Sequence, residues 1–311
     1  MGVWFPTEST VRGIRGDLDE RLKAYPEIWP KYCQKVPSTT QVEPYVWSGA
    51  VPKPREMADG RRIQGLRQLT YNVTNNEYEL TVLIDRKTFE DDQIGTVKQK
   101  IAELSDAWGP FKDEIVADML EAGGTNLAYD GTSFFDDTRT QGKSGTIDNN
   151  STSVAAADSA VPTNAEFLDA MNAILVLMHG YKDDQGREGY NRTAMMTLRV
   201  MAEQAMMRPV LEGLSSTLIS NTDNVFGRGL AEPDFSPFLT AGSTTRTMYV
   251  AAMGASARGP LLYQERTPLE VVTFSDPTDL VRYNGLMIAL RQRFVFAYGE
   301  FRRMLKHVFT T

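Results

Sequence analysis

Histidine and cysteine supply much of the acid–base, metal-binding and nucleophilic chemistry of proteins, and this chain contains very few of them. The two histidines are His179 and His307, and the single cysteine is Cys33. A zinc site usually takes three or four protein ligands, and a nucleophilic cysteine needs an activating base beside it. His179 falls at the end of a predicted helix, where a positive side chain suits the helix dipole. Cys33 lies in a proline-rich stretch, so we predict no catalytic residue and no metal site.

Other motifs for catalysis or phosphate binding are incomplete. No serine stands in a Gly-x-Ser-x-Gly elbow. Gly227-Arg228-Gly229 lacks the length and the Lys-Ser/Thr ending of a phosphate-binding loop, and Asp183-Asp184-Gln185-Gly186 lacks the alternating acids and closing glutamate of a calcium loop. We therefore predict no cofactor-binding residue and a protein that is not an enzyme. A hydrolase that uses scattered acidic residues is the enzymatic alternative.

The composition is that of a globular protein and not of a nucleic-acid reader. The 311 residues suit about two domains, and 41% of them are hydrophobic, which is enough for a sizeable core. The formal net charge is −7, and no run of lysine or arginine exceeds two residues. Proteins that grip DNA carry a basic face, so we expect only weak contact with DNA. A single cysteine excludes an intramolecular disulfide and fits a reducing cytoplasm.

No segment has the pattern of a membrane anchor or a secretion signal. The longest purely apolar run is Ala173–Met178, whereas about 18 apolar residues are needed to span a bilayer. The first residues show no basic segment followed by an apolar stretch. We expect no membrane contact and no secretion of this chain.

The N-terminal 60 residues have too little apolar periodicity for a core of their own. One helix is predicted from about Thr10 to Ala24, where Ile14, Leu18 and Leu22 recur at steps of four. The rest of the segment is punctuated by prolines and is expected to be extended. These positions are Pro6, Pro26, Pro30, Pro37, Pro44, Pro52 and Pro54. The segment is typical of an arm that lies on another surface.

Two stretches of period-two alternation follow, one on each side of Asn75-Asn76. Alternating strands joined by an asparagine-containing turn indicate a β-hairpin. One face of each strand is polar, so we expect this hairpin to project from the body of the protein. Its apolar residues are Leu69, Tyr71 and Val73 before the turn and Tyr78, Leu80, Val82 and Ile84 after it.

A long amphipathic helix is predicted from Gly95 to Ala122. Its apolar residues advance by steps of four and three, which places them on one face. Gly109-Pro110 should break or kink the helix, because proline removes a helical hydrogen bond. Gly123-Gly124 should end it. The residues of the stripe are Val97, Ile101, Leu104, Trp108, Phe111 and Ile115.

The second half of the chain mixes helices with short strands. Thr138–Asp158 is expected to be a flexible loop. Helices are predicted for Asn164–His179, with Thr163 or Asn164 as its cap, and for Ala202–Ile219. Strands are predicted for Thr193–Met201, Thr247–Ala252, Pro260–Gln264, Leu269–Phe274 and Ile288–Tyr298. The fold class is therefore α+β.

Several strings of residues resemble one family in order and spacing. They begin with Tyr45-Val-Trp47-Ser-Gly49-Ala-Val-Pro52, followed by Gly60-Arg61-Arg62 and Glu90-Asp91-Asp92-Gln-Ile-Gly95. Tyr129-Asp130-Gly131-Thr132-Ser133-Phe134-Phe135 and Gly259-Pro260-Leu261-Leu262-Tyr263-Gln264-Glu265-Arg266 continue the pattern. Together they resemble the major head subunit (gpT) of Mu-like tailed bacteriophages, over most of the chain.

The resemblance implies the Hong Kong 97-type capsid fold. It implies an N-terminal arm (1–45), an extended β-hairpin loop (46–92), a peripheral domain with the long spine helix (93–150), an axial domain (151–258) and return strands of the peripheral domain (259–311). The apolar hairpin residues would then contact a neighbouring subunit, and the stripe on the long helix would form the core of the peripheral domain.

The same resemblance implies a function and partners. The chain would assemble with itself, as pentamers and hexamers, into the icosahedral shell that encloses double-stranded DNA. Scaffold, portal and possibly decoration proteins would be further partners. The location would be the virion, after assembly in the bacterial host cytoplasm. Another phage structural protein, such as a decoration or portal-associated protein, is the alternative from the same setting.

Overall fold

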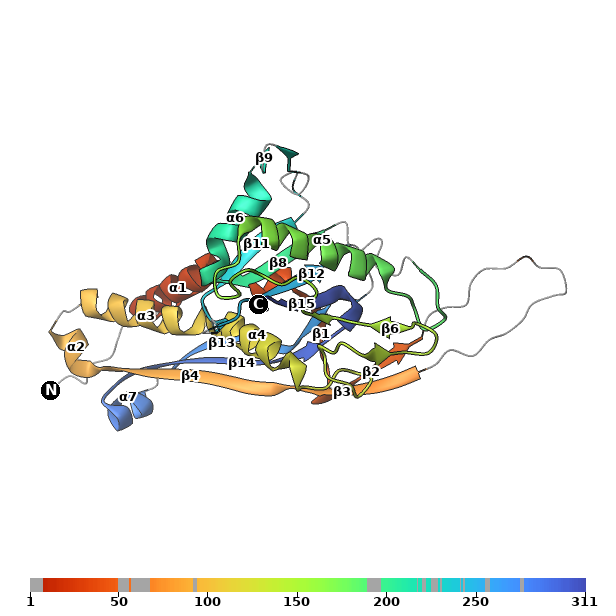
Figure 1. The fold of residues 1–311 in the computed structure, drawn as a ribbon. Coiled ribbons are helices and arrows are strands. Elements are labelled where there is room, and N and C mark those ends of the chain that lie inside the picture. Colours follow the sequence, from red (N-terminus) through yellow and green to blue (C-terminus); the bar gives the residue numbers. More distant parts are fainter. Residues whose placement is uncertain are drawn as a thin grey trace.

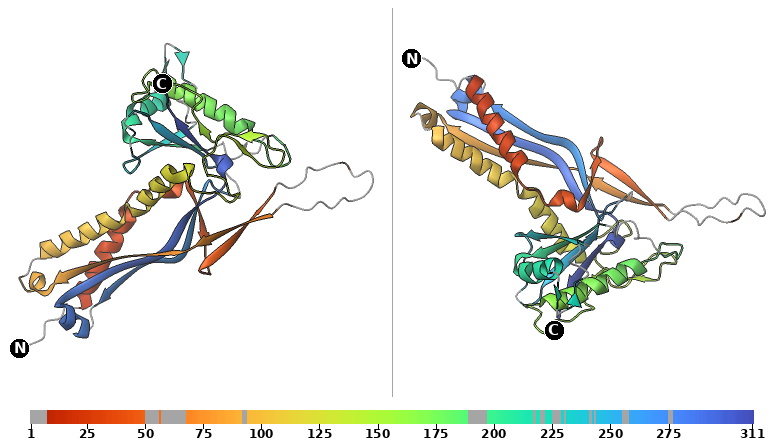
Figure 2. Two further views of the ribbon diagram at one scale, coloured as in Figure 1. Left: turned by 60° about the horizontal axis from the view of Figure 1, so that its bottom comes forward. Right: turned by 90° about the horizontal axis from the view of Figure 1, so that it is seen from above.

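The structure, a computed structural model, is built from two units. An elongated unit surrounds a four-stranded sheet and a compact unit surrounds a five-stranded sheet (Figures 1 and 2). No helix among the described residues is both long enough and apolar enough to cross a membrane. The described residues are 8–49, 56, 68–91, 94–188, 197–216, 218–219, 222–224, 229, 231–240, 242, 244–254, 258–274 and 277–311.

The sheet of the elongated unit has the strand order β1-β13-β14-β4. β1 (Cys33–Pro37) runs parallel to β13 (Leu261–Phe274), which pairs antiparallel with β14 (Gly285–Tyr298). β14 in turn pairs antiparallel with β4 (Asn76–Asp85) along its whole length. The strands predicted at Pro260–Gln264 and Leu269–Phe274 are one strand, β13, with irregular register near its middle.

Two helices cover one face of this sheet. α1 (Glu8–Ala24) packs against α3 (Ile94–Trp108), and the apolar side chains of both meet those of β4 and β14 in a core that we call the distal core. Its buried residues are Ile14, Leu18, Ile84, Val97, Ile101, Leu104, Trp108, Leu280, Leu286, Ile288 and Leu290. The predicted helix at Thr10–Ala24 is confirmed.

The long helix is divided where the sequence predicted a break. α3 ends at Trp108, and α4 (Phe111–Glu121) begins after Gly109-Pro110. A β-carbon on Gly109 would lie 2.8 Å from the ring of Tyr25, so only glycine fits at this point. The apolar stripe consequently serves two cores. Its first four residues belong to the distal core, whereas Phe111 and Ile115 pack against a larger core that spans both units and is called the main core.

The sheet of the compact unit has the strand order β11-β8-β12-β15-β7. β12 (Thr247–Ala252) is the central strand and pairs antiparallel with β8 (Leu198–Glu203) on one side and with β15 (Met304–Val308) on the other. β11 (Ala231–Ser236) and β7 (Asn150–Ser151) are parallel edge strands. α5 (Asn164–Gly180) and α6 (Met207–Ser215) pack together above it (Figure 1). Thr163 caps α5 through a reciprocal capping box with Glu166, as predicted.

Several sequence-based predictions are wrong. The helix predicted at Ala202–Ile219 is limited to α6, because Ala202 lies in β8 and Ile219 in β9 (Leu218–Ile219). β3 (Gln68–Thr74) pairs with β2 (Val42–Ser48), and not with β4, so no hairpin turns at Asn75-Asn76. Residues 138–158 are not a loop throughout, because they include β5 (Arg139–Thr140), β6 (Thr146–Ile147) and β7. Residues 259–311 do not all return to the elongated unit, because β15 lies within the five-stranded sheet. The pairings of β2 with β3 and of β7 with β15 join segments that are separated in the chain, whereas β5 and β6 pair locally.

Short elements complete the architecture. The helices are α2 (Arg86–Glu90) and α7 (Pro277–Tyr283), and a two-stranded sheet joins β9 (Leu218–Ile219) to β10 (Thr222–Asp223). The 3₁₀ turns are η1 (Trp29–Lys31), η2 (Ala122–Gly124), η4 (Gln204–Met206) and η6 (Phe301–Arg303).

Candidate functional site

The antiparallel pair β2 and β3, here called the ribbon, extends away from the junction of the two units (Figure 2). Its two faces differ. Tyr45 and Trp47 of β2, together with Leu69, Tyr71 and Val73 of β3, pack against the main core. The opposite face presents Val42 and Val46, which are 42% and 49% exposed. This outward face therefore carries no charge, and its two valines, which the subunit itself leaves uncovered, lie beside the exposed polar residues Gln68, Thr70, Asn72 and Thr74.

Trp47 anchors the ribbon to the body of the protein. Its ring stacks on Tyr129 at a centroid distance of 4.4 Å and meets Tyr71 edge-on at 6.5 Å. The guanidinium of Arg258 lies 4.8 Å from the same ring, within the range of a cation–π interaction. The indole Nε1 donates to Glu300 Oε2 at 3.4 Å. These contacts fix the base of the ribbon from several directions.

A buried set of charges supports this anchor. Glu300 and Arg302 are 2% and 3% exposed, and an Arg302 nitrogen lies 3.0 Å from Glu300 Oε1. The hydroxyl of Tyr129 donates to both oxygens of Glu300 at 3.4 Å. Arg302 also donates to the side chain of Gln141. Buried ion pairs add little net stability but hold one geometry, because leaving either charge unpaired is costly.

A second buried network holds the point where β3 passes into β4. The Asn75 amide donates to Ser38 Oγ and to Thr40 O, each at 2.9 Å. Gln264 donates to Asn75 Oδ1 at 2.8 Å and accepts from the Tyr45 hydroxyl at 2.7 Å. The network therefore connects the end of β1, both ribbon strands and β13. Asn75 acts as a bend with satisfied side-chain hydrogen bonds and not as a hairpin turn.

Replacing Asn75 with alanine is expected to lower the free energy of unfolding by about 1–3 kcal/mol, because the Gln264 amide loses its buried acceptor. Chemical denaturation of purified subunits measures this change. The neighbouring Asn76 is exposed, so Asn76→Ala should change the stability by less than about 0.5 kcal/mol. Equal losses from the two variants would show that the buried network contributes nothing.

The residues predicted to contact a neighbouring subunit lie largely within this subunit's own cores. Ile84 is buried in the distal core, with Leu80 and Val82 packed against it. Tyr78 stacks on Phe294 at 4.5 Å and touches both cores. The β3 residues Leu69, Tyr71 and Val73 face the main core. The assumption that these apolar faces need a neighbour to cover them is thus corrected, because β14, α3 and the main core cover them.

The strings behind the family resemblance meet in space at the junction. Tyr45 and Trp47 come from the string at 45–52, Tyr129 and Phe134 from the string at 129–135, and Gln264 from the string at 259–266. Phe134 stacks on Tyr298 of β14 at 4.5 Å. Trp47, Glu300 and Arg302 were not predicted from the sequence as site residues. Trp47 could have been found, because it lies in the string at 45–52 that resembles the family.

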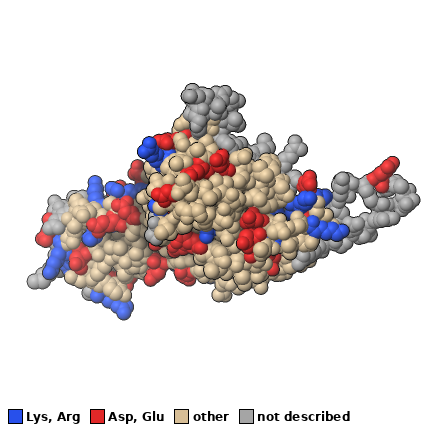
Figure 3. All heavy atoms as spheres, viewed as in Figure 1, with Lys and Arg blue, Asp and Glu red and all other residues tan. Residues whose placement is uncertain are grey.

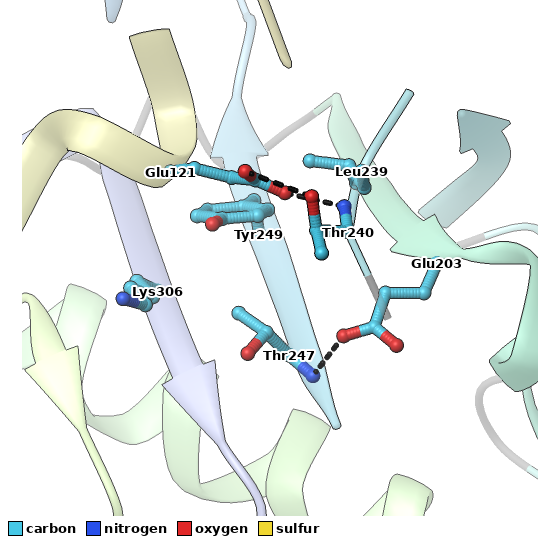
Figure 4. A pocket seen from close by; sticks show the side chains of 7 residues that line it. All are labelled: Glu121, Glu203, Leu239, Thr240, Thr247, Tyr249 and Lys306. Carbon is cyan, nitrogen blue, oxygen red and sulfur yellow. Dashed lines mark hydrogen bonds between the residues drawn. The ribbon is translucent and has the colours of Figure 1, made fainter. Parts of the chain in front are cut away.

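A polar cavity of about 220 Å³ separates the end of α4 from the five-stranded sheet (Figure 4). Glu121 accepts hydrogen bonds from the backbone N–H and hydroxyl of Thr240, and Glu203 accepts the N–H of Thr247 at 3.0 Å. Burial raises the pKa of Glu203 and lowers that of Lys306. No cluster of three or more potential metal ligands occurs among the described residues. The cavity lacks an arrangement of nucleophile and base.

Charged side chains of both signs occur on the surface of the protein (Figure 3). Acidic and basic side chains are interspersed over the face shown in Figure 3, and no basic stripe crosses it. Several arginines are paired with neighbouring acids. Arg291, for example, bridges Glu77 and Glu270 across three strands of the elongated sheet.

Known proteins with similar folds are phage capsid subunits. The procapsid protein of bacteriophage JBD30 aligns with a TM-score of 0.53 and 20% identity, over 98% of this chain and 76% of that one. The capsid protein of cyanophage P-SCSP1u aligns with a TM-score of 0.59 and 11% identity, over 92% and 89%. Three features define the class of fold: an elongated sheet with a spine helix, a compact second unit and a projecting ribbon. This is the Hong Kong 97-type capsid fold.

The sequence comparisons specify the family within that class. Residues 8–205 match the model of the Mu-like prophage major head subunit gpT, and the chain belongs to this family of structural capsid proteins. It is 33% identical to the major capsid protein of Escherichia phage Mu over 122 residues, and 32% identical to the FluMu major head subunit of Haemophilus influenzae over 124 residues. These matches span about 40% of each chain.

Proposed function

We propose that this chain is the building block of an icosahedral phage head, which assembles with itself into a closed shell around double-stranded DNA. The observation that carries the proposal is the uncovered outward face of the ribbon, with Val42 and Val46 exposed above a rigid, buried anchor. Only one face of the ribbon packs on the subunit, so the valines of the other face stay in water in a free monomer. A neighbouring copy that covers this face would explain it.

The two units take the roles implied by the fold. The elongated unit corresponds to the peripheral domain, with α3 and α4 as its spine, and the compact unit to the axial domain around capsomer centres. The extended loop is better assigned to the ribbon and its connection than to residues 46–92, since β4 belongs to the elongated sheet. The arm corresponds to α1 and the segment that leads to β1.

A neighbouring copy offers a matching surface on its elongated sheet, opposite α1 and α3. Phe274, Met287 and Leu83 are register partners across three strands and form one row on that face. Phe274 and Leu83 are 36% and 45% exposed. This row packed against the valines of the ribbon would exclude water without burying a charge. The outward face of the ribbon is proposed to lie on this row of the next subunit.

Electron microscopy of the purified chain tests the proposed function. Hollow closed shells, or pentamers and hexamers, are expected. Two other outcomes would instead fit a portal or decoration role. In one the protein remains monomeric at high concentration and in crowding agents, and in the other it forms only a ring or a small compact trimer. Scaffold, portal and decoration proteins are proposed as further partners, and the virion as the final location after assembly in the host cytoplasm.

Empty shells are expected to bind duplex DNA weakly at physiological ionic strength. A subunit with a net charge of −7 and paired surface arginines releases few counterions from phosphates. Fluorescence anisotropy of labelled DNA at increasing salt concentrations measures the affinity. Sub-micromolar binding with a steep dependence on salt would contradict a shell that contains DNA without gripping it.

A further inference from the structure

His307 occupies an unusual position in the compact unit. The residue is fully buried in β15, and no side chain in the described part of the chain forms a hydrogen bond with its ring. The backbone of Val154 is the polar group that interacts with the ring, and Phe309 lies edge-on to it at 4.8 Å. A polar ring with so few hydrogen bonds in an apolar layer costs stability, and the assembly surfaces described above do not include this residue.

The residues opposite His307 on the two neighbouring strands are uncharged. Its register partners are Met248 on β12 and Ser151 on β7, and the hydroxyl of Ser151 donates to Ser153. Strand alternation places Tyr249 and Lys306 on the other face of the sheet, toward Glu121 and Glu203 of the polar cavity. His307 therefore belongs to the face that α5 covers.

α5 packs against β15 and fills this layer with apolar side chains. Those that are fully buried are Phe167, Ala170, Met171, Ile174 and Met178. Two titratable groups lie at the end of α5 and before β7: Tyr181, whose hydroxyl donates to the carbonyl oxygen of Asp148, and Asp148, whose carboxylate accepts the N–H of Asn150. A proton on the imidazole would find no counter-charge in the layer.

We propose that His307 makes the packing of α5 on the five-stranded sheet sensitive to pH: protonation of the ring in mildly acidic solution loosens the compact unit while the elongated unit stays folded. The elongated unit has no histidine, because the only other one in the chain, His179, is an exposed residue in the last turn of α5.

The direction of the effect follows from linkage. Burial lowers the pKa of His307 from 6.5 to about 4, and the backbone of Val154 opposes this shift slightly. A group whose pKa is depressed on folding contributes stability that is complete above its unfolded pKa and is lost as the pH falls. The loss therefore begins near pH 6.5 and continues to about pH 4. Between pH 7 and pH 5 the equilibrium for opening this layer should rise roughly 20-fold.

Hydrogen exchange of the unassembled full-length chain, followed by mass spectrometry at pH 7 and pH 5 and corrected for intrinsic rates, tests the proposal. Protection of α5 and β15 amides should fall roughly 20-fold, whereas that of β13 and β14 should change less than about twofold. His307→Met should remove the fall, and His179→Gln should retain it. Equal protection of α5 and β15 at both pH values, or the same fall in His307→Met, would overturn the proposal.

A second measurement applies if His307→Met does not fold. In the His179→Gln chain His307 is the only histidine, so its imidazole proton resonance can be titrated without ambiguity. A midpoint near 4 is expected for the folded chain. A midpoint near the ordinary value of about 6.5 would mean that the ring accepts a proton without disturbing the fold, and would overturn the proposal as well.

Discussion

Replacing Val42 and Val46 with aspartate is expected to give a folded, soluble subunit that no longer closes shells. Both valines lie on the outward face of the ribbon, whereas Tyr45 and Trp47 hold the ribbon from the other side. A carboxylate that is desolvated without a partner costs several kcal/mol, and each 1.4 kcal/mol is about tenfold in an equilibrium constant. Because the contact is repeated around a closed lattice, the concentration needed for assembly should rise at least about 100-fold.

Light scattering and electron microscopy measure assembly, and thermal unfolding of the subunit checks the fold. The matched control is Val42→Thr with Val46→Thr, which retains the β-branched shape and adds no charge. This control should assemble at a concentration within about tenfold of wild type. Shells formed by the aspartate variant at wild-type concentrations would refute the role of the outward face. An unfolded variant would show that these side chains belong to the subunit's own core.

The helices of this fold could be predicted from sequence because their signals are local. The apolar residues of the stripe that begins at Val97 recur every three or four positions. Such residues lie on one face of a helix whatever other element covers that face. The break at Gly109-Pro110 follows from the missing proline N–H. The start of α5 follows from Thr163 and Glu166, which are three residues apart.

The strand partners could not be predicted in the same way. Alternation in Tyr78 to Ile84 shows that one face of β4 is apolar, but it does not identify the neighbouring strand. That neighbour is β14, where Leu290 is the register partner of Leu80. The two asparagines at 75 and 76 have the local pattern of a hairpin turn. In the structure the side chain of Asn75 instead forms hydrogen bonds with distant segments, which a local pattern does not reveal.

The anchor of the ribbon was also beyond prediction from local patterns. Trp47 meets Tyr129, Arg258 and Glu300, which come from three separate segments. Glu300 and Arg302 have the composition of a surface turn, yet both are buried because each neutralises the other and the Tyr129 hydroxyl completes the pair. Burial of charge depends on partners and not on residue type, so a hydropathy pattern assigns such residues to the surface.

Truncation of Trp108 to alanine is expected to lower the free energy of unfolding by about 3–5 kcal/mol, as for other buried large aromatic residues. Trp108 is 6% exposed and stands at the end of α3, beside the close approach of Gly109 to Tyr25. Its ring lies 5.9 Å from Phe111, the first residue of α4. The indole thus fills the space where the two helical segments separate, and no adjacent side chain can move into that space without breaking its own packing.

Chemical denaturation with the wild-type chain and two further variants measures this loss. Trp108→Phe retains a ring of smaller volume and should recover part of the stability, about 1–3 kcal/mol relative to alanine. Leu83→Ala serves as the exposed control, since that side chain is 45% exposed on the opposite face of the sheet, and should change the stability by less than about 1 kcal/mol. If Trp108→Ala unfolds at the wild-type midpoint, the ring does not pack between the helices and the face assigned to α3 is wrong. The variant could instead unfold less cooperatively while α5 and the five-stranded sheet keep the wild-type midpoint. That result would show that the distal core unfolds separately from the compact unit.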